Sequence, residues 1–316
     1  FGIGQFNHGF RTPSSIFYFN SLIFLPIIKY FTFYISAVLF LVFSNLILLT
    51  KIIEKFKYKE VDYISYLCLL FFIFINIFFY RIQEHGTDRS AQILIFILLL
   101  YLILFINFEK DYEKNIYKIF VILGLIISLK AFYLLYLTLS IPIFYILFKE
   151  KKFFLVIQVF KEKFFWIFLI LLMNILFVYF INTGCLVYPA KFTCFENLSW
   201  SLTLAEVDKM NLHYENWSKA GHTPTSKVEN PVDHVKFFNW LPNWFKIYFF
   251  TKVSDLIFGI IFTIIVLITF FYKKNKISLK KDMKNNYLII MMFFIFLIEW
   301  FYNHPALRYG GYCLIA

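Results

Sequence analysis

The strongest constraint on this chain is its series of long apolar segments, which are separated by short segments rich in lysine. A helix needs about 20 mostly apolar residues to cross the roughly 30 Å hydrocarbon core of a bilayer. Hydrophobic residues make up 61% of the 316 residues, more apolar surface than a soluble domain of this size can bury. The sequence therefore predicts an all-α fold, a polytopic transmembrane helical bundle. Clear candidate spans are residues 33–50, 63–80, 91–107, 164–182, 253–272 and 286–302.

Two further apolar stretches bring the expected total to about 8–9 membrane segments, some of them short. Residues 14–28 contain Pro26 and form either an interfacial helix or a short entry into the membrane. Residues 116–148 carry Lys118 at their start and one charge near their middle, Lys130. Because lysine-rich segments flank this stretch on both sides, we expect two short helices that meet near Lys130. The alternative is one long tilted helix whose lysine reaches toward the interface.

The ends of the chain suggest the interior of a longer protein. The sequence starts at Phe1 without a signal-peptide pattern and stops as a new apolar run begins. We expect residues 1–316 to form one integral-membrane domain, truncated at both ends, with residues 183–252 as one large extracytoplasmic loop.

Charged residues divide the connecting segments into two groups. The segments 51–62, 108–118, 149–163 and 273–285 hold 18 of the 27 lysines, which is typical of the cytoplasmic side. The net charge of +12 therefore reflects membrane orientation and does not indicate nucleic-acid binding. All arginines and histidines fall in the opposite group of segments: 1–32, 81–90, 183–252 and 303–312.

The arginines indicate chemistry on this outer side. A guanidinium group grips phosphate or carboxylate with two hydrogen bonds, which an ammonium group cannot do. Longer outer segments also collect more polar residues of every kind, which is the simpler explanation for the histidines.

The loop 81–90 contains the best candidate site residues. Asp88 or Glu84 could act as a general base toward an acceptor hydroxyl, or hold a divalent cation; the cofactor is otherwise unknown. Arg89 could neutralise a phosphate leaving group. The alternative is a hydrated turn with internal ion pairs.

Other outer residues supply similar groups. His8, Arg11, His304 and Arg308 are candidate phosphate-binding residues near the two ends of the chain. Glu299 lies one turn inside its helix, where an acid is costly unless it is paired, so it could meet Lys130 or Arg308.

Tryptophan and cysteine add two expectations for the segment 183–252. Its tryptophans could line a glycan or lipid-headgroup site, although Trp240 and Trp244 favour an interfacial aromatic belt. Cys185 and Cys194 could form a disulfide in an oxidising compartment. Cys68 lies within a span and is expected to pack there.

Several short motifs together resemble bacterial multi-pass proteins of the glycosyltransferase C (GT-C) superfamily. They are the glycine-containing segment from His8 to Ser15, Thr87-Asp88-Arg89, the segment from Gly184 to Trp200 with Tyr188-Pro189, and the segment from Pro305 to Gly311.

This resemblance implies sugar transfer from a polyprenyl-phosphate-linked donor to a glycan or lipid acceptor, on the periplasmic face of a bacterial inner membrane. It also implies an acidic residue in the first outer loop. In the related proteins an Asp followed by Tyr-His precedes the glycine-rich segment, and this chain has no such element. Asp88 and Glu84 are the substitutes, with Arg89, Arg308 and Lys130 as phosphate contacts. The implied partners are membrane lipids, the donor and the acceptor.

Two other classes of function remain. A transporter or flippase for an anionic lipid or glycan would predict repeated halves and broken helices, whereas no repeat is visible and only Pro142 lies well inside a long apolar run. A membrane scaffold without chemistry is the third. Convergence of Asp88, Arg89, Lys130, Glu299 and Arg308 on one place would favour the transferase.

Overall fold

The chain folds into a bundle of helices in the computed structural model, which describes residues 1–27, 29–57, 63–79, 87–107, 112–223, 227–271 and 286–316. Within these residues every regular element is helical, so the predicted all-α class is confirmed. The longer helices are α2 (Thr32–Lys57), α3 (Tyr63–Phe78), α4 (Thr87–Ile106), α5 (Tyr112–Leu129), α8 (Lys163–Thr183), α12 (Ser254–Phe271) and α13 (Asn286–Asn303). The shorter ones are α1 (Ser15–Leu22), α6 (Ser140–Lys149), α7 (Phe153–Lys161), α9 (Leu204–Ser218), α10 (Pro231–Val235), α11 (Leu241–Trp244) and α14 (Gly311–Ile315).

Five of the described segments are long and apolar enough to cross a membrane, judged by length and composition. They are Lys29–Lys57, Thr87–Ile106, Ala131–Lys149, Lys163–Thr183 and Leu241–Thr269. The last begins 12 residues before the predicted start of its span, because α11 continues through a π-helix, η6 (Phe245–Val253), directly into α12.

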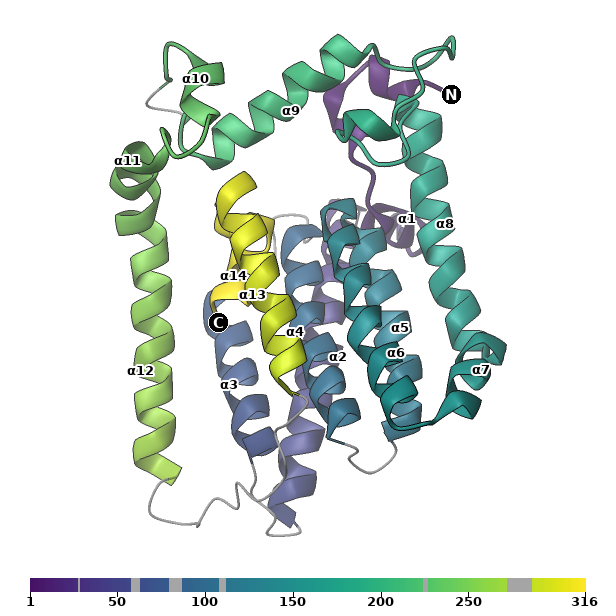
Figure 1. The fold of residues 1–316 in the computed structure, drawn as a ribbon, viewed down its shortest axis with the longest axis vertical. Coiled ribbons are helices and arrows are strands. Elements are labelled where there is room, and N and C mark those ends of the chain that lie inside the picture. Colours follow the sequence, from purple (N-terminus) through teal and green to yellow (C-terminus); the bar gives the residue numbers. More distant parts are fainter. Residues whose placement is uncertain (28, 58–62, 80–86, 108–111, 224–226, 272–285) are drawn as a thin grey trace.

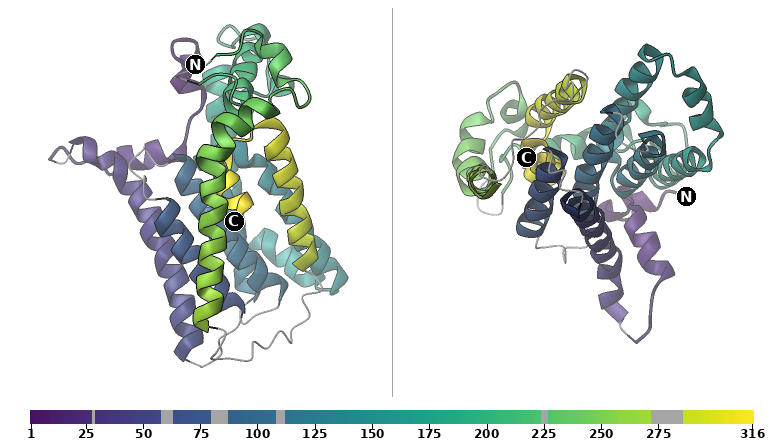
Figure 2. Two further views of the ribbon diagram at one scale, coloured as in Figure 1. Left: turned by 90° about the vertical axis from the view of Figure 1, so that its left-hand side faces the viewer. Right: turned by 90° about the horizontal axis from the view of Figure 1, so that it is seen from below.

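Helix α4 forms the centre of the bundle. Its residues are buried on nearly every side, from Ser90 through Leu98 and on to Ile106, and it packs against α2, α3 and α5. Helix α12 lies at the edge of the bundle (Figures 1 and 2) and packs mainly against α3. Its Phe258 and Phe262 are largely exposed. A helix that is apolar all round needs apolar surroundings everywhere, which neighbouring helices provide for α4.

The stretch around Lys130 is divided into two elements, as expected, and the alternative of one long helix is wrong. Helix α5 ends at Leu129, and a 3-10 helix, η4 (Ala131–Leu139), begins directly after Lys130 and leads into α6. The rings of Phe120 in α5 and Phe144 in α6 lie 6.1 Å apart, so the two arms of this hairpin pack side by side.

Two short helices, α1 and α7, form in segments for which the sequence predicts no single structure or a loop. Residues 14–28 begin with α1, which projects sideways from the bundle (Figure 2). Its Asn20 accepts a hydrogen bond from the Ser36 amide of α2 (3.3 Å) and so joins the two helices. The segment 149–163, expected to be a loop, contains α7, in which Leu155 is buried while Phe154 on the other face is exposed.

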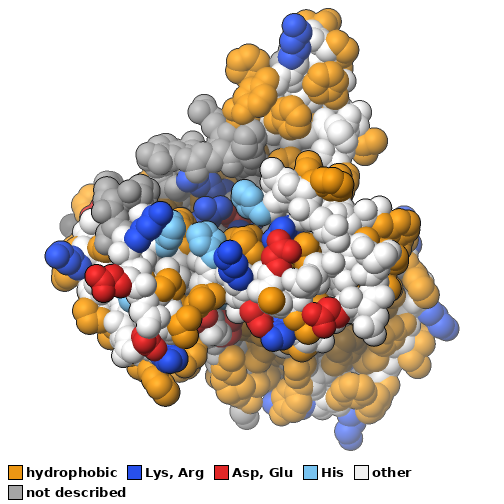
Figure 3. Space-filling model, turned by 90° about the horizontal axis from the view of Figure 1, so that it is seen from above, with side chains coloured by type: hydrophobic (Ala, Val, Ile, Leu, Met, Phe, Trp, Pro, Cys, Tyr) orange, Lys and Arg blue, Asp and Glu red, His pale blue; other side chains and the backbone are white. Residues whose placement is uncertain are grey.

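Helix α9 crosses one end of the bundle, from the end of α8 toward α11, and the N-terminus lies at the same end (Figure 1). We call this the α9 end. Seen from this end, lysine, arginine, acidic and histidine side chains gather on the surface, while hydrophobic side chains surround them (Figure 3). Charged side chains of both signs and histidines therefore lie together at the α9 end.

Candidate functional site

Three of the predicted site residues meet at the α9 end, and we call them the Asp88 cluster: Asp88, Lys130 and Arg308. The Lys130 ammonium donates to Oδ1 of Asp88. The Arg308 guanidinium donates to Oδ2 of the same carboxylate, from Nη2 (2.9 Å) and Nε (3.1 Å). Each carboxylate oxygen thus has its own cationic partner.

Local backbone structure positions each member. Asp88 lies in the first turn of α4, where a negative charge is favoured by the helix dipole. Lys130 has an extended conformation (φ −157°) at the break between α5 and η4. Arg308 lies in a short 3-10 helix, η8 (Leu307–Tyr309), which ends at Gly310 with φ 103°, a conformation that favours glycine. The side-chain amide of Gln92 in α4 donates to the Arg308 carbonyl (3.0 Å) and holds this loop in place.

The Asp88 cluster carries one more positive than negative charge. The side chains of Asp88 and Lys130 are 15% and 21% exposed, so water screens them only partly, whereas that of Arg308 is 54% exposed. Charges in such an environment interact more strongly than in bulk water. Because both oxygens of Asp88 already accept from cations, the arrangement suits anion binding by Lys130 and Arg308 better than proton abstraction by Asp88.

Aromatic rings surround the two cations. The Lys130 ammonium lies 4.8 Å from the centre of the Tyr309 ring, and the Arg308 guanidinium carbon lies 5.4 Å from the Trp217 ring and 5.6 Å from the Tyr309 ring. Such cation–π contacts are worth about 0.5–2 kcal/mol each. Trp217 belongs to α9, so this contact joins the crossing helix to the cluster.

His304 lies on the same tyrosine ring. Its imidazole is 5.7 Å from the rings of both Phe132 and Tyr309. Its Nδ1 is buried and has no hydrogen-bond partner among the described residues. Burial, together with the nearby charges of Lys219 and Lys130, lowers the pKa of His304 to about 4, so the ring is neutral at pH 7.

The remaining predicted residues near the cluster lie as follows. Arg89 follows Asp88 in the first turn of α4 and is half-buried. Oε1 of Glu299 accepts a hydrogen bond from the Asn303 amide (3.1 Å), whereas the two cations that it was expected to meet both bind Asp88. Glu84 lies outside the described residues.

Arg11 belongs to a second group of residues, which we call the Arg11 clip. Its Nη2 donates to Oε1 of Glu206 in α9 (2.5 Å), and its Nε donates to the Gly4 carbonyl (2.7 Å). Gly4 packs against the end of α8 so closely that a Cβ would lie 2.6 Å from the Asn182 carbonyl oxygen. His8, three residues before Arg11, is exposed. The structure therefore brings Lys130 and Arg308 together with Asp88, and it places Arg11 in a different set of contacts.

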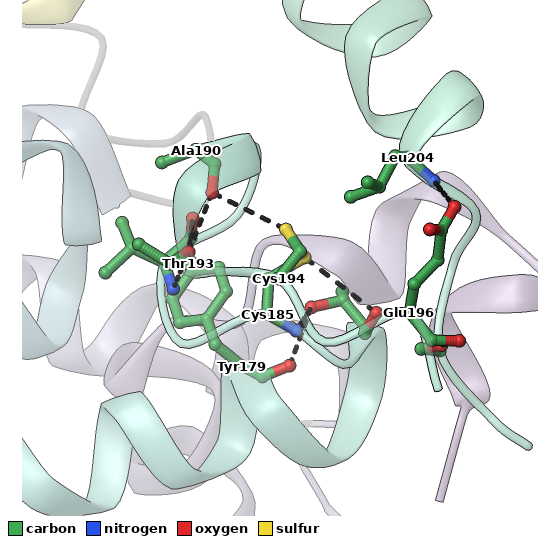
Figure 4. Close-up of a disulfide and its surroundings, with 10 residues drawn as sticks. Tyr179, Cys185, Ala190, Thr193, Cys194, Glu196 and Leu204 are labelled. Atoms are coloured by element: carbon green, nitrogen blue, oxygen red, sulfur yellow. Dashed lines mark hydrogen bonds between the residues drawn. A yellow bond between two sulfur atoms is a disulfide. The ribbon is translucent and has the colours of Figure 1, made fainter. Parts of the chain in front are cut away.

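Cys185 and Cys194 form a disulfide just beyond the end of α8 (Figure 4). The Cys185 amide donates to the Thr183 hydroxyl (3.1 Å), which fixes the start of this loop. Cys68 is buried within α3, as expected.

Among the residues that the structure describes, no group of three or more His, Cys, Asp or Glu side chains is placed to hold a metal ion. Because Glu84 lies outside these residues, the divalent cation considered from the sequence stays a prediction.

Tyr309 is not among the site residues predicted from the sequence, and the sequence leaves the role of Trp217 open. Tyr309 follows Arg308 directly, which is the one local signal for it. The chain contains 22 tyrosines and 46 phenylalanines, so the sequence alone does not distinguish an aromatic residue of the site from the others.

Comparison with known proteins gives one match. No curated protein and no solved structure matches the chain. A family model does match it over residues 2–315, nearly its whole length. The chain belongs to this family, which is described as a domain of unknown function (DUF8201).

Proposed function

We propose that this chain is a multi-pass membrane transferase of the GT-C kind that binds the phosphate of a polyprenyl-linked sugar donor at the α9 end. The observation that carries the proposal is the surplus positive charge of the Asp88 cluster. Two partly buried cations share one carboxylate, and one of them, Arg308, keeps half of its side chain exposed. A phosphate offers oxygens in the geometry that a guanidinium group prefers.

The distribution of apolar surface supports a membrane location. Large apolar side chains are exposed on α8, α12 and α13, for example Ile170, Phe258 and Ile290. Exposed apolar faces on helices of spanning length are suited to lipid. The proposed arrangement keeps about 8–9 membrane segments, some of them short.

Lysine placement supports an orientation. The described lysines at the end of α2 and on both sides of α7 lie opposite the α9 end (Figure 1). Lysine-rich connections stay on the cytoplasmic side. The proposal therefore puts the Asp88 cluster on the outer face, which in a bacterial inner membrane faces the periplasm.

In the proposed reaction, an acceptor hydroxyl oxygen forms a bond to the anomeric carbon of the donor sugar. The bond between that carbon and the lipid phosphate breaks, and the phosphate leaves with the bonding electron pair. Lys130 and Arg308 stabilise the charge that develops on the phosphate. Asp88 holds both cations in place and is a positioning residue. The hydroxyl proton passes to a base, for which Glu84 is the candidate from the sequence.

Binding of a polyprenyl phosphate tests the proposal. The full chain in lipid nanodiscs should bind it, and Arg308→Gln or Lys130→Met should weaken the affinity by about ten-fold or more. Lys191→Gln is the matched control, because Lys191 also pairs with an aspartate, Asp208 (2.5 Å), but at an exposed site. No binding by the wild type, or an equal loss in the control, would overturn the proposal.

A transfer assay separates the proposal from the alternatives. Membranes that contain the protein should move a labelled sugar from a polyprenyl-phosphate donor to an acceptor, and Arg308→Gln, at a side chain that is 54% exposed, should lower transfer at least about ten-fold at unchanged protein abundance. Movement of the intact donor across the bilayer without loss of its sugar would identify a transporter instead. A variant that loses abundance and activity together would indicate a structural role for Arg308.

A further inference from the structure

Half-buried His304 differs from His234, which is the buried histidine among the described residues, in one respect. The Nε2 of His234 lies 3.1 Å from the Lys219 carbonyl oxygen, so that ring is satisfied within the fold. The Nδ1 of His304 is buried without any partner among the described residues. A buried polar atom without a partner costs about 1–3 kcal/mol, and such atoms in native proteins often have a ligand or water partner.

The backbone around His304 is held by three hydrogen bonds. Its backbone amide donates to the Trp300 carbonyl (2.9 Å), and its own carbonyl accepts from the Ala306 amide (2.7 Å). The Pro305 carbonyl between them accepts from the Trp244 indole (2.8 Å). A main chain anchored in this way keeps the imidazole beside the rings of Phe132 and Tyr309, and a binding site requires such a rigid support.

Aromatic rings surround His304, and two cations lie close to them. We define the aromatic box as Phe132, His304, Tyr309 and Trp217, whose rings follow one another around Tyr309 at distances of 5.7–6.0 Å. The two cations of the Asp88 cluster contact the same tyrosine ring at 4.8 and 5.6 Å. The box therefore borders directly on the proposed phosphate site.

This combination of groups selects a class of ligand. A protonated histidine would add to the anion site, but a neutral ring beside two cations offers a hydrogen bond to an uncharged hydroxyl instead. Aromatic faces pack on the apolar faces of sugar rings. We propose that the aromatic box is the sugar-binding subsite of the donor, with His304 hydrogen-bonded to a sugar hydroxyl while Lys130 and Arg308 hold the phosphate. This assignment rests on the proposed function.

The test compares one lipid phosphate with and without a sugar. Full-length protein in nanodiscs is titrated with a bare polyprenyl phosphate and with a panel of the same lipid phosphate carrying a hexose, an N-acetylhexosamine or an aminopentose. We expect the wild type to bind at least one glycosylated member about ten-fold more tightly than the bare lipid. His304→Leu should remove that preference and leave the affinity for the bare lipid within about two-fold.

Two further variants show whether the hydrogen bond is responsible. His304→Asn places an amide near the position of Nδ1, so it should keep part of the preference, about three-fold. His213→Ala is the control, since His213 is an exposed histidine of the same α9 end. Thermal unfolding of each variant shows whether the fold is retained.

The outcomes separate the two proposals. A His304→Leu variant that keeps the full preference, or a wild type without preference for any member of the panel, overturns the sugar subsite but leaves phosphate binding intact. A wild type that binds neither the bare nor the glycosylated lipids overturns the proposed function and the subsite with it.

Discussion

The Asp88 cluster and the Arg11 clip use the same residue types at the same end of the bundle, and they differ in charge balance. In the clip, one arginine meets one glutamate and one backbone carbonyl, and the Arg11 side chain is only 7% exposed. In the cluster, two cations share one aspartate, and the Arg308 side chain is 54% exposed. Both groups contact α9, through Glu206 and through Trp217.

This difference separates a structural contact from a candidate binding site. The donors of Arg11 are used to fix the N-terminal segment against α9, so little remains for a ligand. The Asp88 cluster keeps one surplus positive charge and an exposed guanidinium group. An arginine in an outer segment is therefore expected to form an ion pair. Whether it can also bind an anionic ligand depends on how much of the local positive charge its partners neutralise.

Neutralising the carboxylate of each group, Asp88 in the cluster and Glu206 in the clip, should give the largest difference in stability between the two. Asp88→Asn leaves two partly buried cations close together, and loss of one partner from a buried ion pair costs about 3–5 kcal/mol. Glu206→Gln should cost less, about 1.5–3 kcal/mol, because Glu206 is 41% exposed and the buried Arg11 keeps the Gly4 carbonyl as a partner. Chemical unfolding of both variants in the same detergent measures the difference.

A double variant tests the reason for that loss. Asp88→Asn combined with Lys130→Met removes one of the uncompensated cations, so it should be more stable than Asp88→Asn alone. Equal stability of the single and double variants would mean that repulsion between Lys130 and Arg308 is not the cause.

The disulfide should matter to the clip and not to the cluster. Cys185 and Cys194 close a short loop next to the segment of α8 that holds the N-terminus: the Gly2 amide donates to the Ile181 carbonyl (2.7 Å). Replacing both cysteines by serine should lower the free energy of unfolding by about 2–3 kcal/mol, the loop-closure value for a loop of this length. Limited proteolysis should show earlier cleavage in residues 183–203, with the affinity for polyprenyl phosphate unchanged.

Acid should destabilise the cluster region through His304. Its pKa of about 4 in the folded protein lies below the value of about 6.5 in an unfolded chain. The unfolded state therefore takes up a proton first, and stability present above pH 6.5 is lost as the pH falls toward 4. Between pH 7 and pH 5 the wild type should lose about 2 kcal/mol more than His304→Asn. Parallel unfolding curves for the two proteins would contradict this.

The sequence predicted the helices well, because each apolar run must satisfy its backbone hydrogen bonds internally. The stretch 164–182 corresponds to α8, Lys163–Thr183, and the stretch 63–80 corresponds to α3, Tyr63–Phe78. The sequence did not predict which helix is central. The segments of α4 and α12 are both apolar throughout, and only the packing of the bundle makes one buried and the other exposed.

Three of the residues singled out in the sequence lie together in the Asp88 cluster, but the sequence does not show that they pair with one another. Asp88 and Arg308 are 220 residues apart in the chain, and no local pattern shows that they meet. A lone lysine in an apolar stretch predicts that Lys130 needs a partner, yet Glu299 and Asp88 satisfy that condition equally in the sequence. The break at Lys130 and the loop after α13 together bring the cations to Asp88.

Replacing Arg308 or Arg11 by lysine tests, at constant charge, whether the two arginines differ in phosphate binding. Arg308→Lys keeps the ion pair with Asp88 possible but removes the planar fork, so it should weaken binding of polyprenyl phosphate about five- to ten-fold, or roughly 1 kcal/mol. Arg11→Lys should leave that affinity unchanged, because the donors of Arg11 already bind Glu206 and the Gly4 carbonyl. The same titration in nanodiscs measures both. A loss of similar size in the two variants would mean that net charge at the α9 end, rather than the guanidinium of Arg308, determines phosphate binding.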